Sequence, residues 1–364
     1  MILLFSSNID GGILQFEIQL LKEINQLGKK CFCMISEKAK VTVPSELSAK
    51  VLYYKKFKTL NIHDKNIMNL VERIISLKPD FIWYMDSAIL SSQLCFCLKG
   101  KINQYITIHD PAERHPTNNY SIKVKIKNCF ENSIQKKSIM SANKIILLSP
   151  ESFKCFCAKF PKYKGKADVF ILGAHVPNVI GKSPEECERV DSPYFLFFGR
   201  IDKYKGISTL LEVYKELGTP KATLVIAGKG NLTKKEKRMV MEEEKIILIN
   251  RYIEDEEMIW LFENAKATIL PYIEASQSGI IPISYKFGLP VIISDVNGLR
   301  QFVDDGESGF VCKKKSDYLS AMQKLQNCEV RNKMSKQAIK YYTNHLDWCN
   351  SLKKLLKADI SKVN

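Results

Sequence analysis

The sequence lacks long apolar segments. No run of about 18 apolar residues occurs in the 364-residue chain, so no membrane-spanning helix is predicted. The N-terminus also lacks the basic start and the small-residue cleavage site of a signal peptide. No repeat with a period of about 20 to 50 residues is visible, which argues against solenoids and propellers. We therefore expect a globular, cytoplasmic protein.

Cysteine patterns typical of zinc sites and secreted proteins are also missing. The eleven cysteines include three Cys-Phe-Cys triplets, at Cys31/Cys33, Cys95/Cys97 and Cys155/Cys157. This spacing is neither that of a zinc site nor that of a secreted disulfide framework. We interpret these cysteines as reduced thiols, mostly buried, and predict no metal site.

Acidic residues are too few to balance the basic ones. The chain has 55 Lys and Arg against 39 Asp and Glu, a formal net charge of +16. Residues 1–175 contribute 26 basic and 14 acidic residues, so the first half carries most of the surplus. Such a charge favours a polyanionic partner: nucleic acid, an anionic membrane surface or a phosphorylated substrate.

The chain length and the order of its apolar runs predict two α/β domains. Short buried runs alternate with segments long enough for helices, which favours parallel sheets with helical crossovers. In the first half the predicted strands are 2–5, 30–35, 81–85, 105–108 and 144–148. In the second half the runs lie at 194–200, 223–230, 245–250, 267–272, 290–295 and 309–313. Both halves are therefore predicted to be Rossmann-like, doubly wound sheets.

The segment 176–193 contains Pro, Gly and charge with little apolar periodicity, so we interpret it as the linker. The predicted domains are 1–177 and 178–345. Residues 346–364 are predicted to form a C-terminal helix that packs back toward the N-terminal domain. Two such domains would place the ends of both sheets at a shared central cleft, where ligands of this architecture bind.

Two cations follow the first strand of the second half. Arg200 lies at the carboxyl end of the run FFGR, and Lys205 precedes a helix expected near Ile207. Cations beside a helix N-terminus suit a diphosphate, because the helix dipole and the free backbone N–H groups add to the ion pairing. An ordinary solvated basic turn is the alternative interpretation.

A carboxylate and a second helix start follow the strand at 267–272. Glu274 comes directly after this strand, and Ser278 is placed to cap a helix that includes Gly279, Ile280 and Pro282. Proline is tolerated in a first turn, and Gly279 would let a ligand come close to the backbone. A carboxylate beside an anion site suits a ligand with hydroxyl groups, such as a sugar. A plain capped helix with Glu274 on the surface is the alternative.

The first half offers a glycine pair and a histidine. Gly11 and Gly12 open the first helix, where a donor phosphate or an acceptor could approach the backbone, but the G-x-G-x-x-G spacing is missing. An NAD-dependent dehydrogenase is therefore not predicted. His109 lies at a strand end, in the run HDPAERH. The two histidines and two carboxylates of this run fit no compact metal site.

These motifs together resemble a known family. The runs GRIDKYKG, LVIAGKG and PYIEASQSGIIPISYKFGLPVIISDVNGLRQFVDDGESGFV are similar to the donor-binding half of GT-B glycosyltransferases of the retaining family 4, the group 1 type used in bacterial polysaccharide and glycolipid assembly. The opening strand with its glycines and the run ITIHDP resemble that family's first domain. The resemblance implies a GT-B fold and a nucleotide-sugar-dependent transferase of the hexosyltransferase type.

The resemblance also implies roles for individual residues. Arg200 and Lys205 would grip the nucleotide diphosphate, and Glu274 and the segment from Ser278 through Gly279 and Ile280 to Ile281 would meet the sugar and phosphate. His109 would lie near the transferred sugar. The turn with Arg251 and Tyr252 would contact the base. One position departs from the family, because Pro282 stands where a second glutamate usually binds the ribose.

The implied reaction transfers a sugar from a nucleoside-diphosphate sugar to a hydroxyl of a glycan or lipid-linked acceptor, with retention of anomeric configuration. Loss of the diphosphate leaves an oxocarbenium-like sugar, so the enzyme must stabilise negative charge on the leaving phosphate. No cofactor is expected, and no metal. A nucleotide-sugar epimerase or hydrolase of the same fold is an alternative.

The basic first half suggests a membrane contact. Apolar residues repeat every four positions from Ile122 to Ile134, flanked by Lys123, Lys127, Lys136 and Lys137. We expect this basic helix to rest on an anionic membrane surface at the inner face of the cell membrane, where the first domain would take a lipid-linked acceptor. A helix packed on the sheet, with its lysines in water, is the alternative. A nucleic-acid-binding protein is a further one, but zinc-finger, RRM and KH patterns are missing, so we predict no nucleic acid partner.

Overall fold

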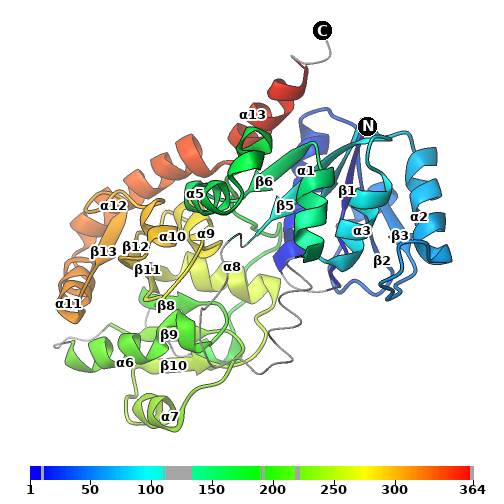
Figure 1. Ribbon diagram of the computed structural model, residues 1–364. Coiled ribbons are helices and arrows are strands. Elements are labelled where there is room, and N and C mark those ends of the chain that lie inside the picture. Colours follow the sequence, from blue (N-terminus) through cyan, green and yellow to red (C-terminus); the bar gives the residue numbers. More distant parts are fainter. Residues whose placement is uncertain are drawn as a thin grey trace. The chain divides into compact units, whose positions relative to one another are not determined.

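The computed structural model describes residues 1–9, 12–109, 111, 133–188, 190, 193–217 and 222–360 (Figure 1). The chain divides into two compact units. The first comprises Met1–Ile171 with Ser351–Asn364, and the second comprises Leu172–Asn350. The unit boundary therefore lies a few residues before the predicted end of the first domain at 177.

The first unit is built on a seven-stranded parallel sheet with the strand order β3-β2-β1-β4-β5-β6-β7. The strands in the middle of this sheet are almost entirely apolar and buried, as expected when helices cover both faces. The strands are β1 (Ile2–Phe5), β2 (Cys31–Ser36), β3 (Val51–Tyr54), β4 (Phe81–Tyr84), β5 (Asn103–Ile108), β6 (Lys144–Leu147) and β7 (Ala167–Val169).

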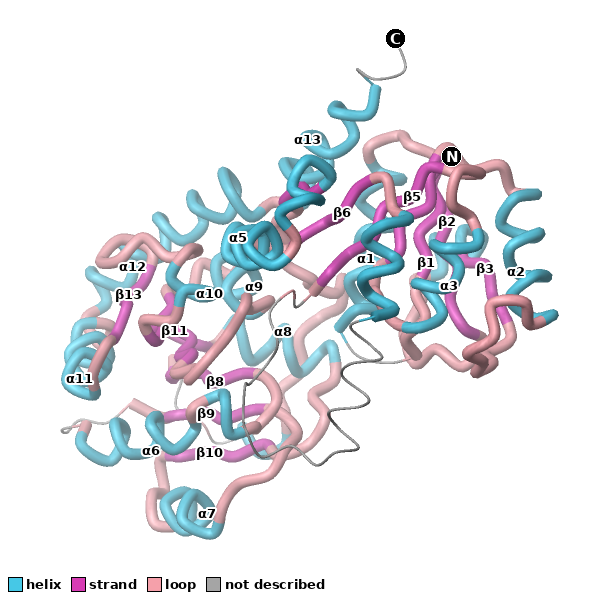
Figure 2. Tube along the Cα trace, viewed as in Figure 1, coloured by secondary structure: helices cyan, strands magenta, loops and turns pink. Residues whose placement is uncertain are grey.

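Helices connect these strands and cover both faces of the sheet (Figure 2). They are α1 (Gly12–Gln26), α2 (Lys65–Ser76), α3 (Ile89–Cys97), the helical residues 133–141 and α5 (Pro150–Lys159). Buried residues of α2, α3, 133–141 and α5 share one hydrophobic core with the sheet. The ring of Phe16 from α1 instead packs near Phe170, with centroids 6.2 Å apart. Four helices therefore lie on one face of the sheet, and α1 lies on the other.

The second unit repeats this architecture with six parallel strands in the order β10-β9-β8-β11-β12-β13. The strands are β8 (Tyr194–Phe198), β9 (Leu224–Ala227), β10 (Ile246–Ile249), β11 (Ala265–Leu270), β12 (Val291–Ser294) and β13 (Gly309–Cys312). The helices are α6 (Ile207–Glu216), α7 (Lys234–Met241), α8 (Asp255–Glu263), α9 (Ile280–Lys286), α10 (Asn297–Arg300), α11 (Lys315–Lys324) and α12 (Cys328–Tyr341), and a last helix, α13 (Trp348–Ile360), begins in this unit.

The C-terminal helix α13 spans the division between the two units. Residues from Ser351 onward group with the first unit, and the Ser351 hydroxyl donates to the Ile171 carbonyl at 3.0 Å. The predicted linker 176–193 is not isolated from the folded core. Its Cys187 is buried, and its Glu186 pairs with Arg251 of the second unit at 2.8 Å.

The prediction of two parallel, doubly wound sheets is confirmed. All six strand runs predicted in the second half form strands, and the five predicted in the first half do so with small shifts of their ends. The edge strands β3 and β7 were missed. Each is short, pairs with a single neighbour and stays partly exposed, so neither produces a long apolar run.

Candidate functional site

Arg200 follows β8 at the carboxyl edge of the second sheet. Its Nη2 donates to the Tyr204 hydroxyl at 3.0 Å, and its Nε lies 3.6 Å from the Asp202 carboxylate. The side chain remains 69% exposed. The hydrogen bond to Tyr204 and the ion pair with Asp202 hold the guanidinium at the strand end and leave most of its surface accessible to a ligand.

Lys205 lies on the same loop and is oriented by aromatic rings. Its Nζ lies 3.6 Å from the ring centroid of Tyr272 and 5.0 Å from that of Tyr204. Tyr272 is buried, and burial raises the pKa of its hydroxyl, so the ring is a neutral platform at physiological pH. Cation–π contact orients an ammonium group without neutralising its charge. Lys205 is therefore a half-buried, oriented cation at the sheet edge.

Gly206 joins the loop after β8 to the loop after β11. Its φ is 71°, and a Cβ atom there would lie 1.8 Å from the Pro271 carbonyl oxygen. The Ile273 N–H also donates to the Tyr204 carbonyl at 2.8 Å. Only glycine permits this approach, and it brings the loop carrying Arg200 and Lys205 against the loop carrying Glu274.

The segment after β11 contains the predicted carboxylate and helix start. Glu274 is half-buried. Helix α9 begins at Ile280, whose N–H donates to the Ser278 hydroxyl at 3.3 Å. Pro282 is the third residue of this helix, where its missing N–H removes no intrahelical bond. Gly279 is exposed and borders open space, because a Cβ atom there would have no non-adjacent neighbour within 4 Å.

Arg251 follows β10, but its guanidinium is fully engaged. All five N–H groups have acceptors: Glu186 binds Nε and Nη2 at 3.1 and 2.8 Å, Glu257 binds Nη1 and Nη2 at 2.7 and 2.8 Å, and the Tyr252 carbonyl accepts from Nη1 at 3.2 Å. These hydrogen bonds lower the pKa values of the Glu186 and Glu257 carboxyls. In this arrangement Arg251 has no N–H group left for a nucleotide base. Tyr252 beside it is 60% exposed.

The first unit contributes His109 directly after β5. Its Nε2 lies 2.8 Å from the Met85 carbonyl oxygen, which fixes the ring at the carboxyl edge of that sheet. Gly12 begins α1 and is exposed, whereas Gly11 lies outside the described residues. Most of the run HDPAERH also lies outside them. In the part of the chain that is described, no group of His, Cys, Asp and Glu could hold a metal ion.

Of the predicted membrane lysines, Lys136 and Lys137 are exposed on the helical residues 133–141. Lys123 and Lys127 lie outside the described residues. Within the described ranges, no helix is long and apolar enough to cross a membrane.

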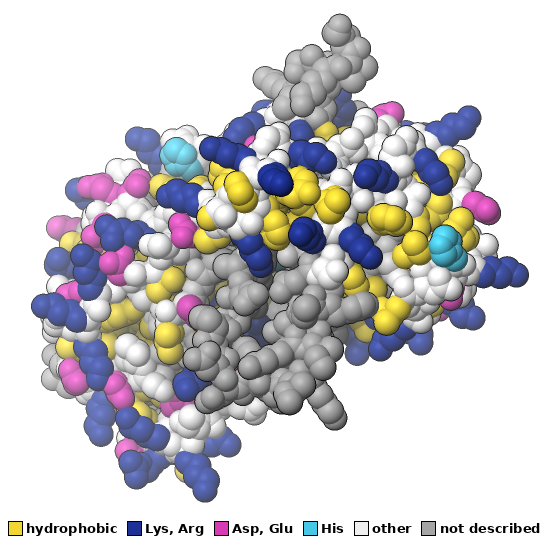
Figure 3. All heavy atoms as spheres, in the orientation of Figure 1, with side chains coloured by type: hydrophobic (Ala, Val, Ile, Leu, Met, Phe, Trp, Pro, Cys, Tyr) yellow, Lys and Arg dark blue, Asp and Glu magenta, His cyan; other side chains and the backbone are white. Residues whose placement is uncertain are grey.

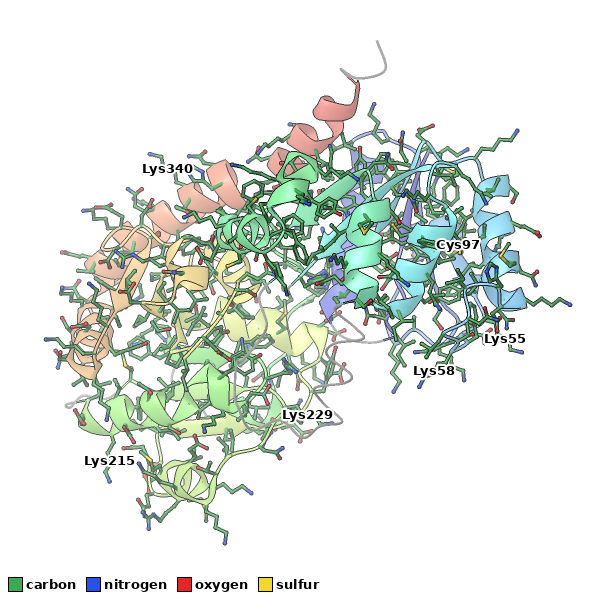
Figure 4. All side chains as sticks on the ribbon, viewed as in Figure 1. Lys55, Lys58, Cys97, Lys215, Lys229 and Lys340 are labelled. Carbon is green, nitrogen blue, oxygen red and sulfur yellow. The ribbon has the colours of Figure 1, made fainter. Side chains whose placement is uncertain are left out.

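Lys229 is a third cation at this edge, and the sequence patterns alone did not identify it. It follows β9 in the run LVIAGKG and is exposed (Figure 4). Phe198 pairs with Ala227 and Ile201 bridges Gly230, so Lys229 lies in register with Arg200 on the neighbouring strand. Neighbouring strands run about 4.8 Å apart. The signal in the sequence was a lysine between two glycines after a strand, and only the strand order places it beside Arg200.

The sequence and the fold were compared with those of known proteins. Residues 181–342 match the family model described as Glycosyl transferases group 1. No curated protein sequence matches the chain significantly. Solved structures match it over almost its full length at low identity. HepE of Anabaena, solved with UDP and glucose, has a TM-score of 0.74 at 14% identity and covers 99% of this chain and 100% of its own.

Two further structures give similar values. WaaG, a glycosyltransferase involved in lipopolysaccharide biosynthesis, has a TM-score of 0.69 at 12% identity, with 97% of this chain and 98% of its own covered. A mutant of S. aureus TarM, solved with fondaparinux, alpha-GlcNAc-glycerol and UDP, has a TM-score of 0.71 at 12% identity, with 98% and 99% covered. The protein has the GT-B fold.

The family match lies in the second unit, whereas the structural matches cover nearly the whole chain. The matched segment contains Arg200, Lys205, Lys229 and Glu274, and it ends at Tyr342, directly after α12. The first unit lies outside the match, so His109 and the glycine loop are related to these enzymes by fold alone.

Proposed function

We propose that this protein transfers a sugar from a nucleoside-diphosphate sugar to a hydroxyl of a glycan or lipid-linked acceptor, with retention of anomeric configuration, as an enzyme of family 4. The observation that carries the proposal is the group of three cations, Arg200, Lys205 and Lys229, at one sheet edge beside Glu274. The family match of the second unit and the UDP and glucose found with HepE support this donor class.

The cations suit the departure of a diphosphate. Arg200 and Lys229 follow neighbouring strands at opposed backbone positions, and like charges placed this way repel each other unless an anion lies between them. Lys205 faces the same edge from its platform on Tyr272. Fixed cations stabilise the charge that builds on the leaving phosphate without reorganising during the reaction. Departure of the diphosphate is thereby favoured without a protein nucleophile.

The sugar is proposed to lie between Glu274 and the start of α9. The Glu274 carboxylate would accept hydrogen bonds from sugar hydroxyls, and the exposed backbone at Gly279 would approach the phosphate or sugar. His109 of the first unit is proposed to meet the transferred sugar. Pro282 has no carboxylate to accept hydrogen bonds from the ribose. The ribose is therefore proposed to be bound by other groups of the site.

The acceptor and location follow from the same proposal. TarM was solved with alpha-GlcNAc-glycerol and WaaG is involved in lipopolysaccharide biosynthesis, which supports a role in polysaccharide or glycolipid assembly. The basic surplus of the first half supports a peripheral position on an anionic membrane at the cytoplasmic face. No cofactor or metal enters the proposed reaction.

The proposal is tested first by ligand binding. The thermal stability of the full-length protein is measured with UDP, GDP and their glucose conjugates, since a ligand that binds only the folded state stabilises it by about 2.7 kcal/mol at a hundredfold excess over Kd. We expect one nucleotide class to raise Tm. Arg200→Ala, Lys205→Ala and Lys229→Ala should each reduce this shift, whereas Lys215→Ala, an exposed lysine of α6, should not.

A second assay addresses the reaction. Incubation of the responding nucleotide sugar with candidate glycan acceptors should give a glycoside whose anomeric configuration matches that of the donor, as read by NMR. Donor turnover that proceeds equally without any acceptor would instead identify a hydrolase or epimerase. If none of the nucleotides raises Tm, the second unit does not contain the proposed donor site.

A further inference from the structure

Three neighbouring helices of the first unit each expose an apolar side chain in the last turn. Ile75 of α2, Phe96 of α3 and Met140 of the helical residues 133–141 are 39%, 45% and 47% exposed. All three helices cover the same face of the sheet. Because each helix runs back against the parallel strands, all three end at the amino edge of the sheet. Figure 3 shows apolar and basic side chains mixed on the visible face around α3.

Lysines follow two of these helix ends, those of α2 and α3. Lys78 precedes β4, and Lys99 and Lys101 precede β5. All three are exposed, and none forms an ion pair with a described residue. Asp80, an acidic residue at this edge, is already paired with the N-terminal amine. The amino edge therefore carries uncompensated positive charge.

The partial negative charges at the helix C-termini offset only part of this positive charge. A helix C-terminus carries roughly half a negative charge, so three helix ends offset about one and a half lysines. The second unit shows that the fold does not require lysines at this position. There three glutamates, Glu242, Glu243 and Glu244, follow α7, and a single lysine, Lys245, precedes β10. A lysine after each helix is therefore not a requirement of this fold.

Lys78 occupies a backbone conformation in which glycine is usual. Its φ is 48°, whereas the corresponding positions after α1 and α3 are Gly28 and Gly100, with φ values of 73° and 75°. A side chain in this left-handed region is strained, and glycine would relieve the strain. A lysine at this position is therefore explained by its charge rather than by its fit to the backbone.

We propose that the amino-edge corner, formed by Ile75, Lys78, Phe96, Lys99, Lys101 and Met140, docks on an anionic lipid surface. Lysine is depleted from protein–protein interfaces, whereas lysines around exposed apolar side chains suit a bilayer, where the ammonium groups meet phosphate and the apolar groups enter the headgroup layer. Arg73 on α2 is engaged, because it donates to the Tyr53 carbonyl. The proposal rests on the membrane location proposed above and names a surface distinct from residues 122–134.

This docking mode has a consequence for the acceptor. His109 lies at the carboxyl end of β5, and Lys101 lies just before its amino end. Six strand residues span about 20 Å, so the reacting edge would lie about that far from the lipid phosphates. The acceptor hydroxyl would therefore belong to the distal part of a lipid-linked glycan rather than to its lipid-proximal part.

The test is co-sedimentation of the full-length protein with vesicles of phosphatidylcholine, with or without phosphatidylglycerol. Binding should require the anionic lipid and weaken with salt. Each lysine near such a surface changes partitioning by about fivefold, so Lys78→Gly with Lys99→Gln and Lys101→Gln should reduce it by about a hundredfold. Lys78→Gly should leave Tm unchanged or raised, which separates lost binding from unfolding. Phe96→Ser with Met140→Ser should also weaken binding.

Matched changes in the second unit serve as controls. Lys215→Gln, Lys333→Gln and Lys340→Gln remove the same charge from exposed positions, two of which Figure 4 labels, and Met241→Ser removes a residue that is 85% exposed. These variants should keep most of the vesicle binding. The proposal would be overturned if both sets of variants lost vesicle binding equally, or if the wild type bound neutral vesicles. It would also be overturned if the protein bound duplex DNA more tightly than vesicles and the same lysine substitutions abolished that binding. The nucleotide Tm shift is a separate readout, so failure of either proposal is recognised independently.

Discussion

Glu17 on α1 is fully buried and should make the stability of the first unit depend on pH. It is 0% exposed, and neither carboxyl oxygen has a hydrogen-bond partner among the described residues. Burial, and next the nearby charge of Asp86, raise the pKa of its carboxyl well above the ordinary value. Asp86 itself accepts hydrogen bonds from Ser6, Ser7 and Ser91. Glu17 is therefore protonated in the folded protein at a pH where it is ionised in the unfolded chain.

The sign and size of the effect follow from proton linkage. Because the folded-state pKa is raised, the folded state binds the extra proton, and its stability falls as pH rises from the unfolded pKa toward the folded one. Between the two pKa values the slope approaches about 1 kcal/mol per pH unit, so the fall in stability between pH 5 and pH 7 is on the order of 1 to 3 kcal/mol. In Glu17→Gln this contribution is absent. Any free-energy penalty for burying the amide of Gln does not change with pH. The change of unfolding free energy with pH, rather than its absolute value, therefore distinguishes the two proteins.

Urea unfolding at several pH values between 5 and 7 measures this slope. The free energy of unfolding of the wild type should fall with pH relative to that of Glu17→Gln. Glu72→Gln, an exposed glutamate of α2 in the same unit, is the matched control and should follow the wild type. Parallel pH profiles for wild type and Glu17→Gln would refute the presence of a neutral, buried carboxyl.

Three further predictions concern the second unit. Gly206→Ala should lower Tm and abolish the nucleotide-induced Tm shift, because the positive φ of Gly206 and the nearby Pro271 carbonyl exclude a side chain. Gly279→Ala should leave Tm unchanged and weaken only nucleotide binding, because a Cβ atom there would border open space. Nucleotide titrations of both variants measure this difference. Arg251→Ala should lower Tm by leaving Glu186 and Glu257 unpaired, with the preference between UDP and GDP unchanged in the same thermal assay; a changed preference would place Arg251 at the base. Treatment with EDTA should leave nucleotide binding and sugar transfer unchanged, and loss of transfer restored by Mg²⁺ would contradict a metal-independent reaction.

Strand prediction worked best where burial is complete. The strands β8, β9, β11 and β12 lie inside the second sheet with helices on both faces, so each appears in the sequence as a short apolar run. The edge strand β7, with all three residues partly exposed, has no such signature. Its strand conformation depends on pairing with β6, which a local pattern does not reveal.

Site prediction was limited by contacts between distant segments. Arg251 was expected to contact a base, yet its guanidinium binds Glu186, which lies 65 residues earlier in the chain. Lys229 belongs to a recognisable strand motif but was not predicted as a site residue, because only the pairing of β8 with β9 places it beside Arg200. Both outcomes depend on tertiary neighbours rather than on local sequence.

Local sequence patterns were sufficient to establish the α/β class, the two parallel sheets and the position of Arg200, Lys205 and Glu274 at strand ends. Apolar runs form buried strands and polar residues follow them, so these features need no long-range information. The three-dimensional fold was needed to show which strands are neighbours, which cations share an edge, and that Arg251 is held by two carboxylates. It also brought the ends of α2, α3 and 133–141 to one basic edge, because that grouping depends on the order in which the strands pair.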